Sequence, residues 1–502
     1  MADDRDPAKV LRKLYGELVD RRPMIERAHA YYDGAHNLAF AGEKFLDAFG
    51  GLFAAFADNW CGVVVDAVEE RMQVQGFRVN ESATADDGAK KLWETNDLDL
   101  QSAIGHIDGL ISGAFYVTVW PGETEGDDKR PEITVESAAA TIVECHPKIR
   151  RRRTAALRTW LADDGFEHAE LFRPEGVYLF RSKAKRTSGI VSASALSQWV
   201  VEDQLDVSKD LDVDGMMANP LGVVPVVEFL NRPRLTKSRR AKWATHSELA
   251  SVVPLQDAVN KLLADMLVAS EFAAYPQRHL TGYEPDDVIG ADGKPTGETA
   301  PPNFKSGPGR LWWLESEQAK FGQFEAADLS SSVSSIELVV QHIASISATP
   351  PHYLRASADR LSGESIKSAE SGLVAKVRRK LRGWGAGWEE VMRLAGTVAE
   401  ISELRGAQQM ETIWRDPETR TESEHVDALV KKKELDVPAP QLWEEAGYTP
   451  EQIKRFPALR AQMQLEGMAA VAAERARLAT ETADQLRRES LAATGGLPPA
   501  EV

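Results

Sequence analysis

The stretch SATPPHYLRASADRLSGES, residues 347–365, lies between two long segments of helical pattern and decides how they are joined. Its two adjacent prolines lack backbone donors and keep the residue before them, Thr349, out of helical geometry, so we expect the first helix to stop there. A second helix is expected to restart within SGES, with Ser362 or Ser365 as its N-cap. The stretch therefore predicts a short, mildly basic loop that carries His352, Tyr353, Arg355 and Arg360.

Long helices are predicted on both sides of this loop. Residues 329–347 place apolar side chains at three- and four-residue steps and serines on the other face, whereas 364–410 form a longer helix that three glycines are expected to bend. A further helix over 246–274 starts at a capping-box spacing of Thr245 and Glu248. Such helices suit side-by-side packing around an aqueous passage, and they also fit an ordinary helical bundle. The residues concerned are Leu329, Val333, Ile336, Val340 and Ile343 for the apolar stripe, and Gly383, Gly385 and Gly387 for the bends.

The rest of the chain predicts an α+β fold. The first ~75 residues are helical in pattern and begin after an Asp-Pro pair, while several segments between 110 and 230 resemble strands separated by turn residues. Residues 275–328 are rich in Gly and Pro, with short strands expected in RHLTGY, GRLWWLE and KFGQFEA. The C-terminal part is again helical and ends in ATGGLPPAEV, which we expect to be disordered.

Composition narrows the function classes. With 43% hydrophobic and 27% charged residues in 502, the chain fits a soluble globular protein of several substructures. It contains no apolar run of membrane-spanning length and no secretory signal pattern, so no membrane partner is expected. Two cysteines, Cys61 and Cys145, form no disulfide framework. The net charge of −17 argues against tight nucleic-acid binding, so any DNA contact is expected to be local and weak.

Motifs that would indicate catalysis are lacking. The sequence has no HExxH, GxSxG, dinucleotide-binding GxGxxG or P-loop spacing, and we predict no catalytic residue, cofactor or metal site. DLDVDG at 210–215 matches half of an EF-hand loop, but Leu221 stands where the bidentate glutamate belongs, so a turn between strands is the better interpretation. The basic run KIRRRR, Lys148 to Arg153, is either a nucleic-acid or partner patch or, as we favour, a solvated strand and turn.

Three stretches resemble a known family. They are residues 31–79, from YYDGAHNLAF to MQVQGFRV; residues 248–282, ELASVVPLQDAVNKLLADMLVASEFAAYPQRHLTG; and residues 307–396, from GPGRLWWL through ISATPPHYL to WGAGWEEVMRLA. In this order they resemble the portal proteins of tailed bacteriophages, in the branch found in long-tailed phages of actinobacteria. The resemblance rests on many weakly specific positions and covers most of the first ~400 residues.

The resemblance implies the phage portal fold and a ring of twelve subunits at one capsid vertex. It implies long stem and wing helices with a β-rich wing, a small α/β clip and a helical C-terminal crown. The implied boundaries are 1–245 for N-terminal helices and β-rich wing, 246–274 and 329–347 for the stem, 275–328 for the clip, 348–363 for the tunnel loop, 364–410 for the bent wing helix, and 411–502 for the crown with a flexible tail.

The resemblance also implies partners and a location. Double-stranded DNA would be packaged and ejected through the channel without sequence preference. The large terminase and then a head-completion adaptor would dock on the clip, and major capsid and scaffolding proteins would surround the ring. The protein would belong to the virion, at the portal vertex of the capsid, and would assemble in the host cytoplasm.

Two sets of side chains follow as expected sites. In the tunnel loop, rings of Arg355 and Arg360 would touch phosphates and His352 and Tyr353 would add weaker contacts; alternatively the loop is a plain connector in which Tyr353 and Leu354 pack back on the protein. In the clip, adjacent strand residues point to opposite faces, so one tryptophan is expected inside and one at an interface, unless both are buried in the oligomer. The expected clip residues are Arg278, Lys305, Arg310, Trp312 and Trp313, whose basic members are rim contacts or merely solvated.

Two other classes of function compete with this interpretation. One is a capsid or scaffold-type assembly protein without DNA passage. The other is an enzyme, such as a nuclease or ATPase, whose site is too scattered to see in the sequence.

Overall fold

The computed structural model describes residues 6–40, 47, 57–80, 82, 85–122, 130–149, 151–185, 216–235, 243–274, 278–282, 287–299, 320–323, 329–354, 363–418 and 422–494. The chain divides into two compact units of interleaved segments. Unit 1 contains Met1–Glu70, Ser102–Thr118 and Val135–Lys380, and unit 2 contains Arg71–Gln101, Val119–Thr134 and Leu381–Val502. Helices and antiparallel sheets occur in both, which confirms the predicted α+β class.

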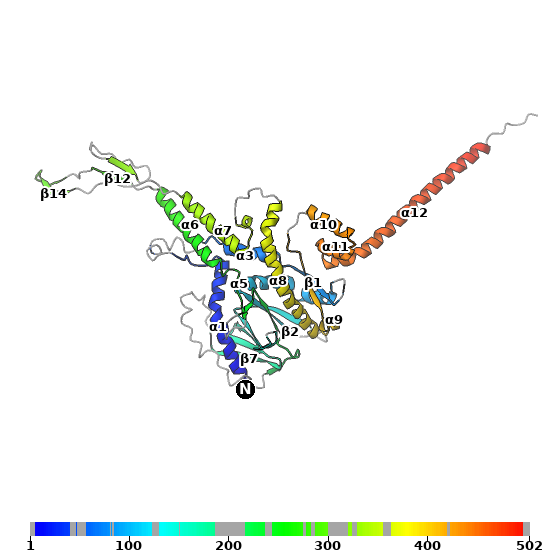
Figure 1. Cartoon of the computed structure of the whole chain (residues 1–502), viewed down its shortest axis with the longest axis horizontal. Helices are drawn as coiled ribbons and strands as arrows, with labels where there is room; N and C mark the ends of the chain where they lie inside the picture. Colours follow the sequence, from blue (N-terminus) through cyan, green and yellow to red (C-terminus); the bar gives the residue numbers. More distant parts are fainter. Residues whose placement is uncertain are drawn as a thin grey trace, which may run out of the picture. The chain divides into compact units, whose positions relative to one another are not determined.

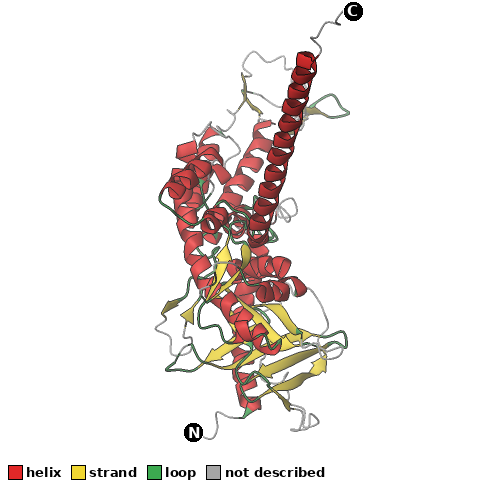
Figure 2. Cartoon of the chain, turned by 90° about the vertical axis from the view of Figure 1, so that its right-hand side faces the viewer, coloured by secondary structure: helices red, strands yellow, loops and turns green. Residues whose placement is uncertain are grey.

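A five-stranded antiparallel sheet in unit 1 is covered by the first helix, α1 (Pro7–Tyr32). As the Asp-Pro pair predicted, α1 begins with Pro7 in its first turn and with the Asp6 carboxylate accepting a hydrogen bond from the Ala8 N–H at 3.0 Å. Figure 2 shows the strands in yellow. They follow one another in sequence order as β4 (Thr141–Cys145), β5 (Arg153–Leu161), β6 (Phe166–Phe172), β7 (Gly176–Lys185) and β8 (Met216–Ala218).

The core between α1 and this sheet reflects the helical periodicity of α1 and the two-residue periodicity of the strands. The helix contributes buried residues at steps of three and four, and the strands contribute residues that alternate between faces. Their burial removes apolar surface from water and so fixes the helix on the sheet. The buried side chains are Leu11, Leu14, Tyr15 and Leu18 from α1, and Ile142, Ala155, Leu157, Ala169, Leu171 and Phe180 from the strands.

A second, three-stranded sheet places β2 (Ala114–Pro121) between β3 (Pro131–Ser137) and β9 (Val226–Leu230). Helix α5 (Leu98–Ser112) leads into β2. A Cβ added at Gly105 of α5 would lie 2.8 Å from Phe115 and Val135, so only glycine permits this close approach of helix to sheet. The other small elements of unit 1 are α3 (Trp60–Glu69) and the paired strands β10 (Arg234–Leu235) and β11 (Trp243–Ala244).

A helical hairpin forms the most extended part of unit 1. Helices α6 (Val253–Ala274) and α7 (Ser330–Ser347) lie side by side (Figure 1). At their far end β12 (Arg278–Thr281) pairs with β15 (Lys320–Gln323), so the chain runs out along α6 and returns along α7. These strands confirm the predictions for RHLTGY and KFGQFEA. A further hairpin of β13 (Asp287–Ile289) and β14 (Pro295–Thr299) was not predicted.

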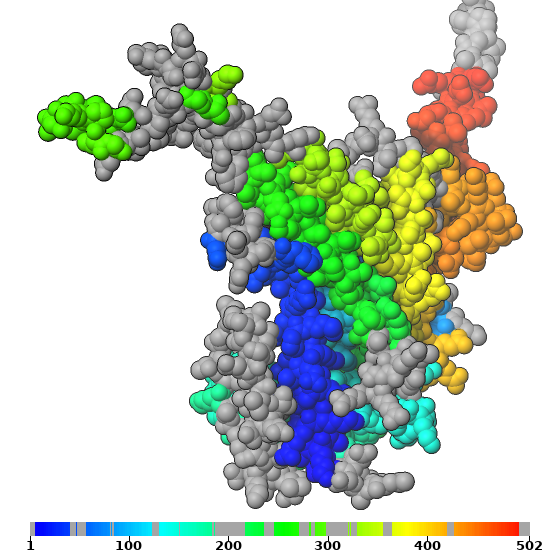
Figure 3. All heavy atoms as spheres, turned by 60° about the vertical axis from the view of Figure 1, so that its left-hand side comes forward, coloured from blue at the N-terminus to red at the C-terminus, as the bar shows by residue number. Residues whose placement is uncertain are grey.

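Helix α8 (Gly363–Val398) follows α7 in the sequence after residues 348–362. Its residues up to Lys380 belong to unit 1 and its later residues to unit 2. On one face of unit 1, α6, α7 and the first half of α8 lie next to each other as green, yellow-green and yellow surfaces (Figure 3).

Unit 2 is built on a strand pair that joins distant parts of the chain. Strand β1 (Val74–Val79), predicted from MQVQGFRV, pairs antiparallel with β16 (Met410–Trp414). Beside them, the ring centroids of Trp93 and Trp388 are 5.1 Å apart and those of Phe77 and Trp93 are 5.5 Å apart. The helices of this unit are α4 (Asp87–Thr95), the second half of α8, α9 (Ser402–Arg405), α10 (Glu422–Glu434), α11 (Ala439–Glu445) and α12 (Pro450–Thr494).

Gly385, one of the three predicted bend points, has a packing reason within unit 2. A Cβ there would lie 3.1 Å from the indole nitrogen of Trp414, and its carbonyl accepts a hydrogen bond from the Thr412 hydroxyl at 3.0 Å. The glycine thus lets α8 approach β16 closely.

Candidate functional site

The end of α7 shows how the two prolines work. Ala348 caps the helix in the left-handed conformation, with φ of +54°. The Ser347 hydroxyl donates to the Ile343 carbonyl at 2.6 Å, and the Thr349 N–H donates to the Ala344 carbonyl at 3.0 Å. Pro350 then continues in an extended conformation, with ψ of 135°. The predicted stop is confirmed, and the last helical carbonyls are paired by the residues that leave the helix.

A short 3₁₀ turn, η2 (Pro351–Tyr353), follows the end of α7 and contacts α8. Leu354 is 2% exposed. The Tyr353 hydroxyl lies 3.5 Å from Oε1 of Glu370, and Nε2 of His352 lies 3.7 Å from the same oxygen. The two rings contact each other edge to face with centroids 4.7 Å apart.

This geometry agrees with the connector alternative for Leu354 in the single chain. Both rings are partly buried and lie near Glu370 of the same chain. The turn that carries them is partly exposed to solvent. DNA contact by His352 and Tyr353 stays a prediction. Arg355 and Arg360 lie outside the described residues, as does Ser362, and α8 begins at Gly363.

A buried charge cluster in unit 1 links α8 to the end of α7 and to the segment before α6. Lys380 donates to Oε1 of Glu248 at 2.5 Å and also to the side-chain oxygen of Asn231. Lys376, one turn earlier in α8, lies 3.5 Å from the other Glu248 oxygen and donates to the Ser347 carbonyl at 2.6 Å. Lys380 thus joins α8 to the segment before α6. Lys376 contacts the same segment and also binds the end of α7.

Electrostatics keeps this cluster ionised. Burial by itself would raise the pKa of Glu248, but the two ammonium groups of Lys380 and Lys376 outweigh it and lower that pKa to about 2. Burial lowers the pKa of Lys380 to about 8; Glu248 opposes this shift and Lys376 adds to it. Two cations share one carboxylate, so the cluster holds an excess positive charge beside the end of α7.

The predicted capping box of Thr245 and Glu248 is wrong. Helix α6 begins at Val253, seven residues after the predicted start at 246, and residues 248–252 form turns. The Glu248 side chain is held by Lys380, and its N–H donates to the Leu110 carbonyl at 2.9 Å, so it is not available to cap a helix. Lys376 and Lys380 were not singled out in the sequence. Their spacing of four residues was the available signal, but lysines four apart on a helix are ordinary on a solvated face.

The other predicted sites lie mostly outside the described residues. In the clip, Arg278 lies in β12 opposite Gln323. Lys305, Arg310, Trp312, Trp313 and the expected strand GRLWWLE lie outside, as do DLDVDG at 210–215 and residues 495–502 of the C-terminal ATGGLPPAEV. The first two residues of that segment end helix α12, so the expected disorder is wrong for them. The described residues of the basic run, all but Arg150, form the end of the β4–β5 hairpin and the start of β5, which confirms the predicted strand and turn. Binding of a partner by this run stays a prediction.

Among the described residues of unit 1, His29 lies beside a serine and an aspartate, but not as a nucleophile with its base. Nε2 of His29 lies 2.9 Å from Asp108 and 3.0 Å from the Ser112 hydroxyl. Both partners contact the same ring nitrogen, so the ring cannot pass a proton from serine on one nitrogen while aspartate orients the other. Among the described residues no group of three potential metal ligands occurs, and no described helix is long and apolar enough to cross a membrane.

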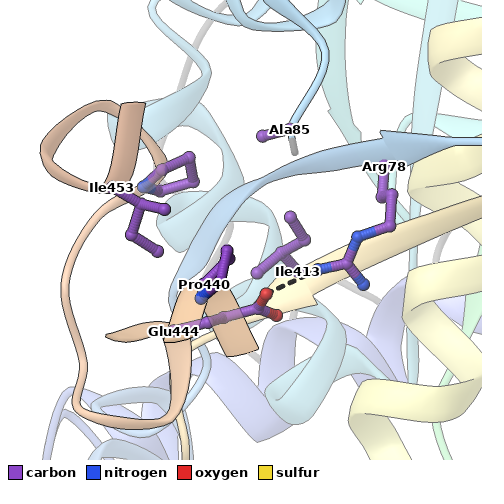
Figure 4. A pocket seen from close by; sticks show the side chains of 7 residues that line it. Arg78, Ala85, Ile413, Pro440, Glu444 and Ile453 are labelled. Carbon is purple, nitrogen blue, oxygen red and sulfur yellow. Dashed lines mark hydrogen bonds and ion pairs between the residues drawn. The ribbon is translucent and has the colours of Figure 1, made fainter. Parts of the chain in front are cut away.

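Unit 2 has a small crevice beside the β1–β16 pair (Figure 4). Arg78 lies in its wall and donates to Glu411 at 2.7 Å and to Glu444 at 2.5 Å. The remaining lining is apolar, and the Arg78 cation is already paired. The residues that line the crevice therefore connect α11 and α12 to the β1–β16 pair. They include no free reactive group. The other lining residues of the crevice are Ala85, Ile413, Pro440, Pro450 and Ile453.

Comparison with known families decides between the structural and enzymatic alternatives. The family model "Phage portal protein, SPP1 Gp6-like" matches residues 19–445, which is most of the chain. This chain belongs to that family of phage portal proteins. Portal proteins are structural components of the phage particle that assemble as oligomeric rings, and they are not enzymes. The competing enzyme interpretation is therefore wrong.

Individual relatives agree with the family. The portal protein of Mycobacterium phage L5 is 28% identical over 440 residues, covering 86% of this chain and 83% of the relative. The portal protein of Mycobacterium phage D29 is 28% identical over 436 residues, covering 85% and 82%. Both come from phages of actinobacteria, the branch that the resemblance named. A solved structure titled as the neck of a native GTA particle, computed with C12 symmetry, matches with a TM-score of 0.38, 14% identity, and coverage of 82% of this chain and 90% of that one.

Proposed function

We propose that twelve copies of this portal protein form the ring at one capsid vertex and conduct double-stranded DNA during packaging and ejection. The family match over residues 19–445 supports this proposal, because it covers the proposed stem, clip and tunnel loop, most of the proposed wing and part of the proposed crown. The α6–α7 hairpin would be the stem, residues 275–328 the clip, the sheets and α8 the wing, and the C-terminal helices the crown.

The clip would be the docking platform. The large terminase would bind there during packaging and the head-completion adaptor afterwards, and capsid and scaffolding proteins would hold the ring in the shell. Hydrolysis of ATP would belong to the terminase, which leaves the portal as a passive channel and platform. Trp312 and Trp313 are the proposed anchors in the clip, with Arg278, Lys305 and Arg310 at its rim.

The loop after α7 would project into the channel. Arg355 and Arg360 would form rings that touch phosphates in any sequence, and His352 and Tyr353 would add contacts when released from Glu370. A net-acidic chain with few basic loop residues suits this task, because a strongly basic channel would trap the duplex through counterion release.

The test is a phage that carries Arg355→Ala and Arg360→Ala together. We expect normal particle assembly with reduced packaged DNA or reduced retention, measured as nuclease-protected DNA per particle. The matched control is Arg12→Ala with Lys91→Ala, which removes two exposed cations from α1 and α4. Unchanged packaging and retention in the loop variant would show that these arginines do not contact DNA, while the portal role would stand.

A further inference from the structure

The end of the β4–β5 hairpin carries exposed basic side chains, although the chain as a whole has a net negative charge. Lys148, Arg151 and Arg152 are exposed there, and within the described part of the chain no carboxylate forms an ion pair with any of them. Arg158 of the same sheet, by contrast, is paired with two carboxylates. Arg158 lies 2.9 Å from Glu136 and 2.8 Å from Glu170. The hairpin end therefore keeps its charge available for a partner.

The hairpin end is also held in a defined shape. Nδ1 of His146 accepts hydrogen bonds from the N–H groups of Lys148 at 3.2 Å and Ile149 at 3.1 Å. The N–H of His146 donates to the Arg152 carbonyl at 2.7 Å, and the N–H of Arg152 donates to the Ile149 carbonyl at 2.9 Å. A charged tip with a fixed backbone loses little conformational freedom on binding.

The hairpin is anchored at its base. Ile142 of β4 and Ala155 and Leu157 of β5 are buried in the core beneath α1. Lys13 of α1 forms an ion pair with Glu144 at the end of β4, so the nearest acidic residue of the hairpin is already occupied. The base is thus packed in the core, and its Glu144 is already paired with Lys13.

We propose that this hairpin tip, defined by Lys148, Arg151 and Arg152, binds the phosphates of double-stranded DNA outside the channel. A duplex presents a negative charge about every 1.7 Å of its axis, so closely spaced cations on one tip can contact neighbouring phosphates. Interactions beyond about 8–10 Å are screened at physiological salt, so the tip acts locally despite the net charge of −17. In a portal ring, the tip would be repeated once in each subunit.

A covalently closed DNA circle tests this proposal, since a closed circle cannot be threaded through a ring. Binding of the assembled full-length protein to a fluorescent circle is measured over a series of salt concentrations. For Arg151→Ala with Arg152→Ala we expect affinity at low salt to fall by about tenfold or more and the slope of log K against log salt to become shallower. The matched control, Lys91→Ala with Lys431→Ala, removes two other exposed cations and should stay within about twofold of the wild type.

Three results would overturn the proposal. The first is equal loss, or no loss, in the hairpin and control variants. The second is unchanged binding to the circle together with lost binding to polyglutamate, which would indicate an acidic protein partner. The third is failure of the hairpin variant to form the wild-type assembly in sedimentation, which would make the tip a subunit contact. None of these results bears on Arg355 and Arg360, because a closed circle does not reach the channel.

Discussion

Glu248 holds together parts of unit 1 that are far apart in the sequence. Its carboxylate contacts Lys376 and Lys380 of α8, and Lys380 also donates to Asn231 after β9. Glu248 is 3% exposed, Lys380 7% and Asn231 1%. Charges so buried stabilise a fold only when their partners are present, since an unpaired buried charge is costly.

The two lysines are expected to differ in their contribution to stability. Lys380→Met removes the shorter ion pair and is expected to lower the free energy of unfolding by about 3 kcal/mol. Lys376→Met leaves a neutral Lys380–Glu248 pair and removes the donor to the Ser347 carbonyl, so a smaller loss of about 1–2 kcal/mol is expected. Denaturant unfolding of both variants measures the difference. A larger loss for Lys376→Met than for Lys380→Met would contradict the assignment of Lys380 as the main partner.

Acid should destabilise the protein through the same carboxylate. The folded pKa of Glu248 is about 2, below its ordinary value of 4.5, so its contribution to stability is present above about pH 4.5 and is lost as the pH falls towards 2. The full contribution is about 3 kcal/mol. Urea unfolding at several pH values should show an acid limb that is less steep in Glu248→Gln than in the wild type. Parallel limbs in the two proteins would mean that Glu248 is not the group responsible.

At the scale of elements, the connection from α7 to α8 depends on one strained residue. Ala348 has a φ of +54°, a conformation that side chains with a Cβ adopt only at a cost. Ala348→Gly is expected to raise the free energy of unfolding by up to about 1 kcal/mol, because glycine is the preferred residue at this C-terminal position.

Ala348→Val is the matched comparison, since a branched side chain increases the strain at the same φ. It is expected to lower the free energy of unfolding, as measured by thermal or denaturant melting. Equal stability of the glycine and valine variants would show that the backbone at Ala348 relaxes in solution and is not strained.

Which of these elements could be predicted depends on how local their signals are. Pro350 and Pro351 act on their own backbone, so the end of α7 was predicted to within two residues. The start of α6 was not, because Glu248 satisfies a local pattern with Thr245 but pairs instead with lysines more than 120 residues away. Helices α4 and α5 were not predicted, although Asp86 is a local signal that caps α4 by accepting from the Ala89 N–H.

At the scale of the whole molecule, the sequence predicted the class and the order of parts better than their pairing. The strand at 74–79 was recognised by its own residues, but its partner at 410–414 was not, because a pairing across more than 300 residues leaves no local pattern. In the predicted tunnel loop, the stop before the two prolines is confirmed, whereas contact with DNA stays a prediction. The prediction did not include Glu370, whose contact with His352 and Tyr353 depends on the packing of α8.

Electron microscopy of the purified protein shows directly whether it forms the proposed portal ring. We expect closed rings of twelve subunits with an open channel of duplex width along the axis. A monomer, or a closed assembly without an axial channel, would contradict this proposal.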